Sequence, residues 1–80
     1  MRNMVELVSI DEGRILVDAD SITAILEMKN MTVRDENNRI SKLPDHSLVI
    51  IGSLQFKIKS TYDETVTSIK EQEHLNNIGI

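Results

Sequence analysis

The segment from residue 47 to about residue 74 constrains the fold most, because it reads as a β-hairpin that runs directly into a capped helix. Residues 48–51 are Leu-Val-Ile-Ile, and Gly52-Ser53 follows them. A two-residue turn with glycine first is typical of type II′ hairpin turns. In residues 54–58 apolar and polar side chains alternate, which predicts a strand with one buried face. The residues expected on that face are Leu54, Phe56 and Ile58.

The helix that follows the hairpin has a clear start signal. Thr61 and Glu64 form the T-x-x-E pattern of a capping box, in which each residue satisfies a backbone N–H of the other. Apolar side chains then recur at i, i+4 and i+7, so one stripe should face the core. That stripe consists of Tyr62, Val66 and Ile69. We expect a helix over about 62–74, ended by Asn76-Asn77, with residues 78–80 as a loose apolar tail.

Residues 4–18 predict a second hairpin at the start of the chain. Residues 4–10 are short and rich in β-branched side chains, and residues 14–18 supply the return strand. Gly13 can take the left-handed conformation that closes a three-residue hairpin loop.

Residues 18–29 leave two alternatives open. Asp18, Asp20 and Ser21 can each bond a nearby backbone N–H, which favours a turn or a single helical turn. From Ile22 the chain alternates, with Ile22, Ala24, Leu26 and Met28 on one side and Thr23, Ile25, Glu27 and Lys29 on the other. This alternation favours a half-buried strand. A helix over 20–29 is the competing interpretation, because the segment contains several good helix formers.

The polar insert at residues 30–45 is the least regular part of the chain. Residues 35–38 are Asp-Glu-Asn-Asn, a turn signal, and residues 43–45 are Leu-Pro-Asp, a second break. Between them, residues 39–41 could pair back on residues 32–34 as a short hairpin. The alternative is a surface loop.

Together these segments predict an α+β fold for the single domain 1–80. We expect a small antiparallel sheet of about five strands, an optional extra hairpin at 31–41, and one C-terminal helix packed on the sheet. With one Phe, one Tyr and no Trp in 80 residues, the core should be aliphatic. The chain has no cysteine and therefore no disulfide, so self-association is a reasonable route to extra burial in so small a domain.

Residues that carry chemistry are sparse, and we expect no catalytic residue, no cofactor and no metal site. Asp18 and Asp20 are the best carboxylate pair, but the positions after them are Ile22 and Thr23, where a calcium loop needs an oxygen ligand and a glycine. His46 and His74 have no ligand-forming neighbours and are interpreted as surface residues. The formal charge of −4 argues against binding to nucleic acid, which needs clustered Lys and Arg.

Two stretches resemble a known family. Residues 17–27, V-D-A-D-S-I-T-A-I-L-E, and residues 47–66, which include F-K-I-K-S and a capped helix start, are similar to the FlbD-like small proteins of flagellar and swarming motility. The resemblance covers about residues 5–70, and the insert at 30–45 is longer than in family members. It implies a small cytoplasmic bacterial protein with no known catalytic activity, or a phage-encoded relative.

The sequence therefore predicts a non-catalytic accessory module of bacterial or phage origin, located in the cytoplasm, that acts through a protein partner and can form a homo-oligomer. Its alternatives are a phage- or element-encoded inhibitor of a host protein and a nucleic-acid-binding regulator. No apolar run reaches the roughly 18 residues that a membrane span needs, so no membrane partner is expected. The predicted partner contacts are Met31, Val33, Arg34, Arg39, Ile40 and Leu43 in the insert and Leu75, Ile78 and Ile80 in the tail.

Overall fold

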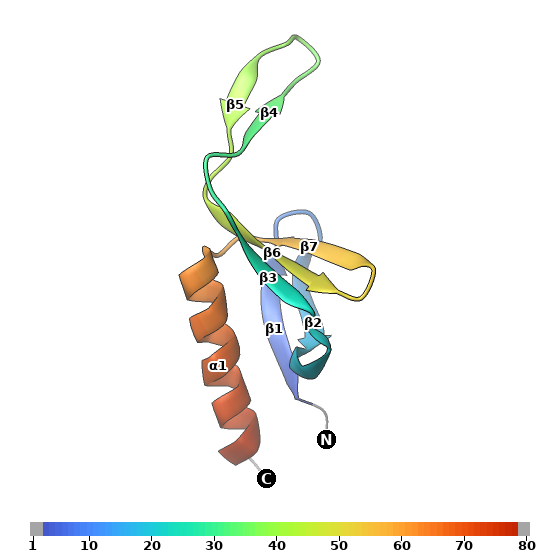
Figure 1. The fold of residues 1–80 in the computed structure, drawn as a ribbon, viewed down its shortest axis with the longest axis vertical. Helices are drawn as coiled ribbons and strands as arrows, with labels where there is room; N and C mark the ends of the chain where they lie inside the picture. Colours follow the sequence, from blue (N-terminus) through green and yellow to red (C-terminus); the bar gives the residue numbers. More distant parts are fainter. Residues whose placement is uncertain (1–2, 79–80) are drawn as a thin grey trace.

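The computed structural model describes residues 3–78 as a curled sheet, one helix and a projecting hairpin (Figure 1). The elements in chain order are β1 (Met4–Ser9), β2 (Gly13–Asp18), the short 3-10 helix η1 (Ala19–Ser21), β3 (Ala24–Met28), β4 (Thr32–Arg34), β5 (Ile40–Lys42), β6 (His46–Ile51), β7 (Leu54–Ile58) and α1 (Tyr62–Ile78). Five strands form an antiparallel sheet in the order β2-β1-β7-β6-β3, and β4 and β5 form a separate two-stranded sheet. The α+β fold predicted from the sequence is confirmed.

The local predictions for the strands hold in most places. Residues 4–18 form a hairpin in which Ser9 pairs with Gly13, and Gly13 has a φ of +79°. Residues 24–28 are a strand and not part of a helix. The turn before them is η1, capped by the Asp18 side chain, which accepts a hydrogen bond from the Asp20 N–H. Gly52 begins the β6–β7 turn with a φ of +60°.

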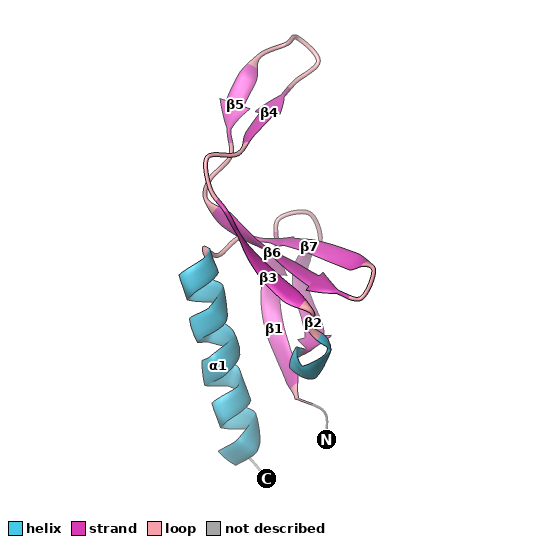
Figure 2. Ribbon diagram, in the orientation of Figure 1, coloured by secondary structure: helices cyan, strands magenta, loops and turns pink. Residues whose placement is uncertain are grey.

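The sheet bends sharply where its two halves meet. β1 and β7 share one pair, Ser9 with Ile58, flanked by backbone hydrogen bonds from Ile10 N to Lys57 O at 2.8 Å and from Lys59 N to Val8 O at 2.9 Å. Because the contact is so short, the β1–β2 hairpin and the β3–β6–β7 group can turn their inner faces toward each other. α1 packs against β1, β3 and β6 (Figure 2). The core enclosed in this way consists of Val5, Leu7, Val17, Val49, Ile58 and Ile69.

The helix begins as the capping box predicts. Glu64 Oε1 accepts hydrogen bonds from both the backbone N–H and the hydroxyl of Thr61, each at 3.0 Å, and the Glu64 N–H donates to Thr61 Oγ1 at 3.4 Å. One turn further, Thr65 is fully buried, and its hydroxyl oxygen lies 2.8 Å from that of Ser47 on β6. The sequence pattern did not single out this polar contact, which fixes the start of the helix on the sheet.

The predicted end of the helix was wrong, because α1 continues through Asn76 and Asn77 to Ile78. The reason is that helix amides complete the edge of β1 beyond its short contact with β7. Gln72 bonds both backbone groups of Glu6, accepting from the N–H at 2.7 Å and donating to the carbonyl at 2.9 Å. Asn76 Nδ2 donates to the Met4 carbonyl at 2.8 Å. Four residues of helix and two of strand both rise about 6–7 Å, so the two spacings match.

Leu54 and His46 lie in environments that differ from the expected ones, and β3 shows which of its two faces is buried. Leu54 is 58% exposed, because the β6–β7 turn extends past the helix and the core while burial falls along β7 from Ile58 outward (Figure 1). On β3 it is Ile25 that packs on the core, whereas Leu26 is 45% exposed. His46 is not a surface residue but 3% exposed, since it begins β6 opposite Met28, and its Nδ1 lies 2.9 Å from the Pro44 carbonyl oxygen.

Candidate interaction surface

The insert forms an arm that stands away from the rest of the protein, and we use the word arm for residues 31–43. β3 leads into β4 and β5 leads back into β6, so the arm lengthens the molecule to 53 Å while its other dimensions are 22 and 19 Å (Figure 1). Residues 31–42 are all exposed, and Leu43 at the base is half-buried. The short hairpin that the sequence left as an alternative is therefore the observed structure.

The tip of the arm is held by Asp35. Its carboxylate accepts hydrogen bonds from the backbone N–H groups of Asn37 at 2.9 Å and Arg39 at 2.8 Å. Its backbone also pairs with Arg39, at 3.0 Å, and Asn38 takes the left-handed conformation with a φ of +60°. Arg39 thus closes the turn and does not start the return strand.

The pairing is shifted by one residue from the predicted one, and this changes which side chains share a face. The observed strand is 40–42 and not 39–41, with Arg34 opposite Ile40, Val33 opposite Ser41 and Thr32 opposite Lys42. A shift of one residue moves every side chain of a strand to the other face. Lys42, which the sequence pattern did not indicate, therefore joins the candidate surface. Asp35 is the sequence feature that could have indicated Lys42. An aspartate side chain can close a turn onto the backbone of Arg39, and the return strand then starts at Ile40.

The register divides the arm into an apolar face and a basic face, because successive side chains of a strand alternate. The apolar face holds Met31, Val33, Ser41 and Leu43, and the Leu43 N–H donates to the Met31 carbonyl at 2.8 Å. The basic face holds Thr32, Arg34, Ile40 and Lys42. Ile40 is 63% exposed within this second face.

Charge is unevenly distributed between the arm and the rest of the chain. The arm carries a net charge of +1, from three Lys or Arg and two Asp or Glu residues. The other residues together carry −5, which gives the formal net charge of −4. Among residues 3–78 the ion pairs are Arg14 with Glu6 and Lys29 with Glu27, and neither includes a cation of the arm. Arg34, Arg39 and Lys42 are therefore available to an outside partner.

The remaining predicted contacts lie elsewhere. Leu75 and Ile78 are exposed, but they belong to the last turns of α1 and not to a loose tail. Figure 1 places that end of the helix at the opposite end of the molecule from the arm. The structure thus separates the insert residues from the tail residues instead of bringing them into one surface. Ile80 lies outside the described residues.

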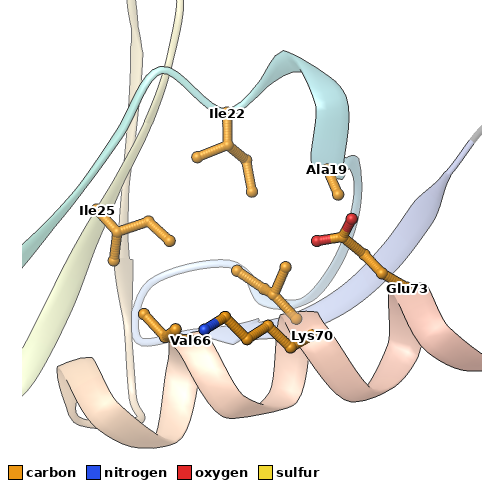
Figure 3. Close-up of a pocket in the computed structure, with 7 residues that line it drawn as sticks. Ala19, Ile22, Ile25, Val66, Lys70 and Glu73 are labelled. Atoms are coloured by element: carbon orange, nitrogen blue, oxygen red, sulfur yellow. The ribbon is translucent and has the colours of Figure 1, made fainter.

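A shallow cavity of about 250 Å³ opens between α1 and the η1–β3 segment. Figure 3 shows Ile22, Ile25 and Ala19 on one side of it, with Val66, Lys70 and Glu73 of the helix on the other. Lys70 and Glu73 are the only charged side chains in its lining. Within residues 3–78, no group of three or more His, Cys, Asp or Glu residues is arranged to hold a metal ion. In the part of the chain that the structure describes, no helix is long and apolar enough to span a membrane.

These features define a small α+β domain with a projecting, two-faced β-arm. The chain matches no protein-family model, no curated protein and no solved structure. The resemblance to the FlbD-like proteins therefore stays a prediction.

Proposed function

We propose that this chain is a non-catalytic interaction module, of bacterial or phage origin, that binds a protein partner through its arm. The observation that carries the proposal is the arm's apolar face, where Met31, Val33 and Ser41 are all exposed although they belong to a regular hairpin. An isolated two-stranded hairpin is marginally stable in water. A partner that covers the apolar side would stabilise such a hairpin, because burial of apolar surface lowers the free energy of the complex.

The cations of the basic face would influence which partner binds and how it is oriented on the arm. Arg34 and Lys42 lie on the side of the ribbon opposite the apolar face, so a partner that covers the apolar face would meet these long side chains only where it reaches around the edge of the ribbon. Charges at the rim of an interface speed association and select partners more than they add affinity. The preferred partner surface is therefore an apolar groove or sheet edge with acidic neighbours.

The experiment is affinity capture from the source cells with face-specific variants of the full chain. Val33→Ser with Met31→Ser removes apolar surface from one face, and Arg34→Gln with Lys42→Gln removes charge from the other. All four residues are exposed, so both variants should fold like the wild type. We expect the apolar-face variant to lose the partner and the basic-face variant to keep it with slower association. Capture of the same protein by the apolar-face variant would contradict the proposal.

An inhibitor of a host protein would use the same arm, and the captured partner distinguishes it from an accessory protein. A host enzyme whose activity falls on addition of the purified chain indicates an inhibitor. A partner encoded beside the motility genes indicates the accessory role that the FlbD-like resemblance implies.

A second candidate is nucleic-acid binding by the same arm. The observation in its favour is the basic face, because a two-stranded β-ribbon fits the major groove of DNA. Against it stand the acidic tip, Asp35 and Glu36, and the net charge of −5 on the residues outside the arm. Binding to duplex DNA or RNA at low salt that disappears with Arg34→Gln and Lys42→Gln would favour this candidate, since the electrostatic contribution is largest there.

A further inference from the structure

The outer edge of β2 is open and regular. In an antiparallel pair, residues that exchange both backbone hydrogen bonds alternate with residues whose backbone groups face away. The Ala19 N–H bonds the Asn3 carbonyl at 2.9 Å, which fixes the phase of this alternation in the β1–β2 hairpin. The residues of β2 whose N–H and C=O groups face away from β1 are then Arg14, Leu16 and Asp18. Within residues 3–78 no strand lies on that side.

In the five-stranded sheet, the other end strand is defended and the edge of β1 opposite β2 is covered. β1 is completed by β7, Gln72 and Asn76. β3 is an edge strand, but it lies beside α1 and carries Glu27 on the same face as Ile25, and a charge on the inner face of an edge strand discourages pairing. β2 has no proline, no lysine and no charge on its inner face. Of the two end strands of the five-stranded sheet, β2 is therefore the one better suited to accept another strand.

The sequence of β2 is complementary to itself. We infer that a second copy of this chain pairs with it antiparallel along β2, about a two-fold axis at Leu16. This register sets Arg14 against the partner's Asp18 at both ends and Leu16 against the partner's Leu16 at the centre. The inner face sets Ile15 against the partner's Val17.

Each of these pairings is favourable. The two-fold pairing sets the outward-facing residues Arg14, Leu16 and Asp18 of one copy against the same three residues of the other. Each opposed pair exchanges two backbone hydrogen bonds, so the three pairs would form about six. Opposite charges and apolar side chains directly across strands both stabilise a sheet. Leu16 is 63% exposed and Ile15 is half-buried, so pairing would cover surface that the single chain leaves in water. The result is a continuous sheet of ten strands with the two cores side by side.

Cross-linking tests the register directly, because the chain has no cysteine of its own. Leu16→Cys would place two sulfurs across a hydrogen-bonded pair with Cα atoms about 5.5 Å apart, within disulfide reach. Arg14→Cys would place them about 13 Å apart along the strands, outside that reach. Leu26→Cys, on the exposed face of the other edge strand, is the control. We expect Leu16→Cys to form disulfide dimers at least tenfold faster than either. Equal rates for Leu16→Cys and Leu26→Cys, or for Leu16→Cys and Arg14→Cys, would overturn the inference.

Charge reversal gives an independent test in solution. A single strand pair covers less than the roughly 1,600 Å² of a standard interface, so we expect a dimer that dissociates in the micromolar range in analytical ultracentrifugation. Arg14→Glu puts like charges opposite each other at both ends and should weaken the dimer about tenfold or more. Asp18→Arg should do the same. An equimolar mixture of the two variants restores both opposite-charge pairs and should restore the dimer. Lys57→Glu, with the same charge change on the paired strand β7, should leave it intact.

A wild-type chain that stays monomeric at millimolar concentration would refute this pairing, as would a mixture no more dimeric than its components. The proposal does not depend on the arm. β2 variants that lose the dimer and still capture the partner are the expected result of both proposals. β2 variants that keep the dimer would refute the β2 pairing alone, and arm variants that still capture the partner would refute the proposed function alone.

Discussion

The fully buried hydroxyls of Ser47 and Thr65 join the first turn of the helix to the sheet. The two oxygens lie 2.8 Å apart, and Ser47 also donates to the Ser60 carbonyl at 3.1 Å. Ser47→Ala would leave the Thr65 hydroxyl in the core with only a long contact to Ser60, 3.4 Å away. A buried polar group deprived of its partner costs about 1–3 kcal/mol. We therefore expect a loss of about 1–2 kcal/mol in the free energy of unfolding, measured by urea denaturation.

The matched control is Ser41→Ala, at an exposed position of the arm. It should change the same free energy by less than about 0.5 kcal/mol. Equal stability of the two variants would mean that the hydroxyl pair contributes nothing beyond packing.

Glu64 couples the start of the helix to pH. Hydrogen bonds from the backbone N–H and then the hydroxyl of Thr61 hold the pKa of the Glu64 carboxyl below its ordinary value. A carboxyl whose pKa is lower in the folded state stabilises the protein above its unfolded pKa, about 4.3, and loses that contribution as the pH falls through the folded value. We expect Glu64→Gln to melt at a lower temperature than the wild type at pH 7, with the difference vanishing as the pH falls below about 4.3. A difference that is constant with pH would assign the effect to the side-chain shape instead.

At the scale of the element, the helix contributes to the sheet through its side chains as well as its packing. Gln72 and Asn76 occupy the positions on β1 that a strand would otherwise take, and this is why the helix extends to Ile78. Asn76→Ala should cost about 0.5–1.5 kcal/mol, the usual contribution of such a hydrogen bond, and should speed amide exchange in the last helical turn. Asn77→Ala is the neighbouring control and should be nearly neutral. Equal effects of the two changes would show that the contact to Met4 is unimportant.

The elements that local chemistry determines were predictable, and those that depend on distant contacts were not. Gly13, Gly52 and the Thr61–Glu64 box each act within four residues, and all three took the expected conformation. The end of the helix depended on β1, some 70 residues away along the chain, and an Asn-Asn pair carries no sign of such a partner.

The arm was likewise predictable in part. Its existence followed from the polar turn and the flanking β-formers, whereas its register depended on one carboxylate, that of Asp35, closing the turn on Arg39. The residues of the insert that we predict to contact a partner all lie on this one hairpin, but their division into an apolar and a basic face required that register.

At the scale of the whole molecule, the arm and the edge of β2 are separate surfaces that need not compete. Figure 1 shows the arm joined to the end of β3 and the start of β6, while β2 is at the other end of the strand order, beside β1. Pairing through β2 would therefore present two arms from one dimer. A partner with two sites would then bind by avidity, because the second contact becomes intramolecular. The arm would act as the binding element and the β2 edge would set its copy number.

If the arm serves only to bind a partner and the β2 edge only to form the dimer, the domain should fold without its arm. Met28 pairs with His46, so residues 29–45 can be replaced by Asn-Gly, a two-residue sequence that favours hairpin turns. The replacement removes a segment that contributes no residue to the buried core, and it shortens the loop between β3 and β6 from 17 residues to two. Each halving of a loop lowers its closure cost by about 0.6 kcal/mol, so the free energy of unfolding should stay the same or rise by up to about 2 kcal/mol. Thermal and urea denaturation measure it, and ultracentrifugation of the same variant should show the dimer unchanged. A fall of more than about 2 kcal/mol would mean that the arm is part of the folding unit, and the separation of roles proposed for arm and sheet edge would be wrong.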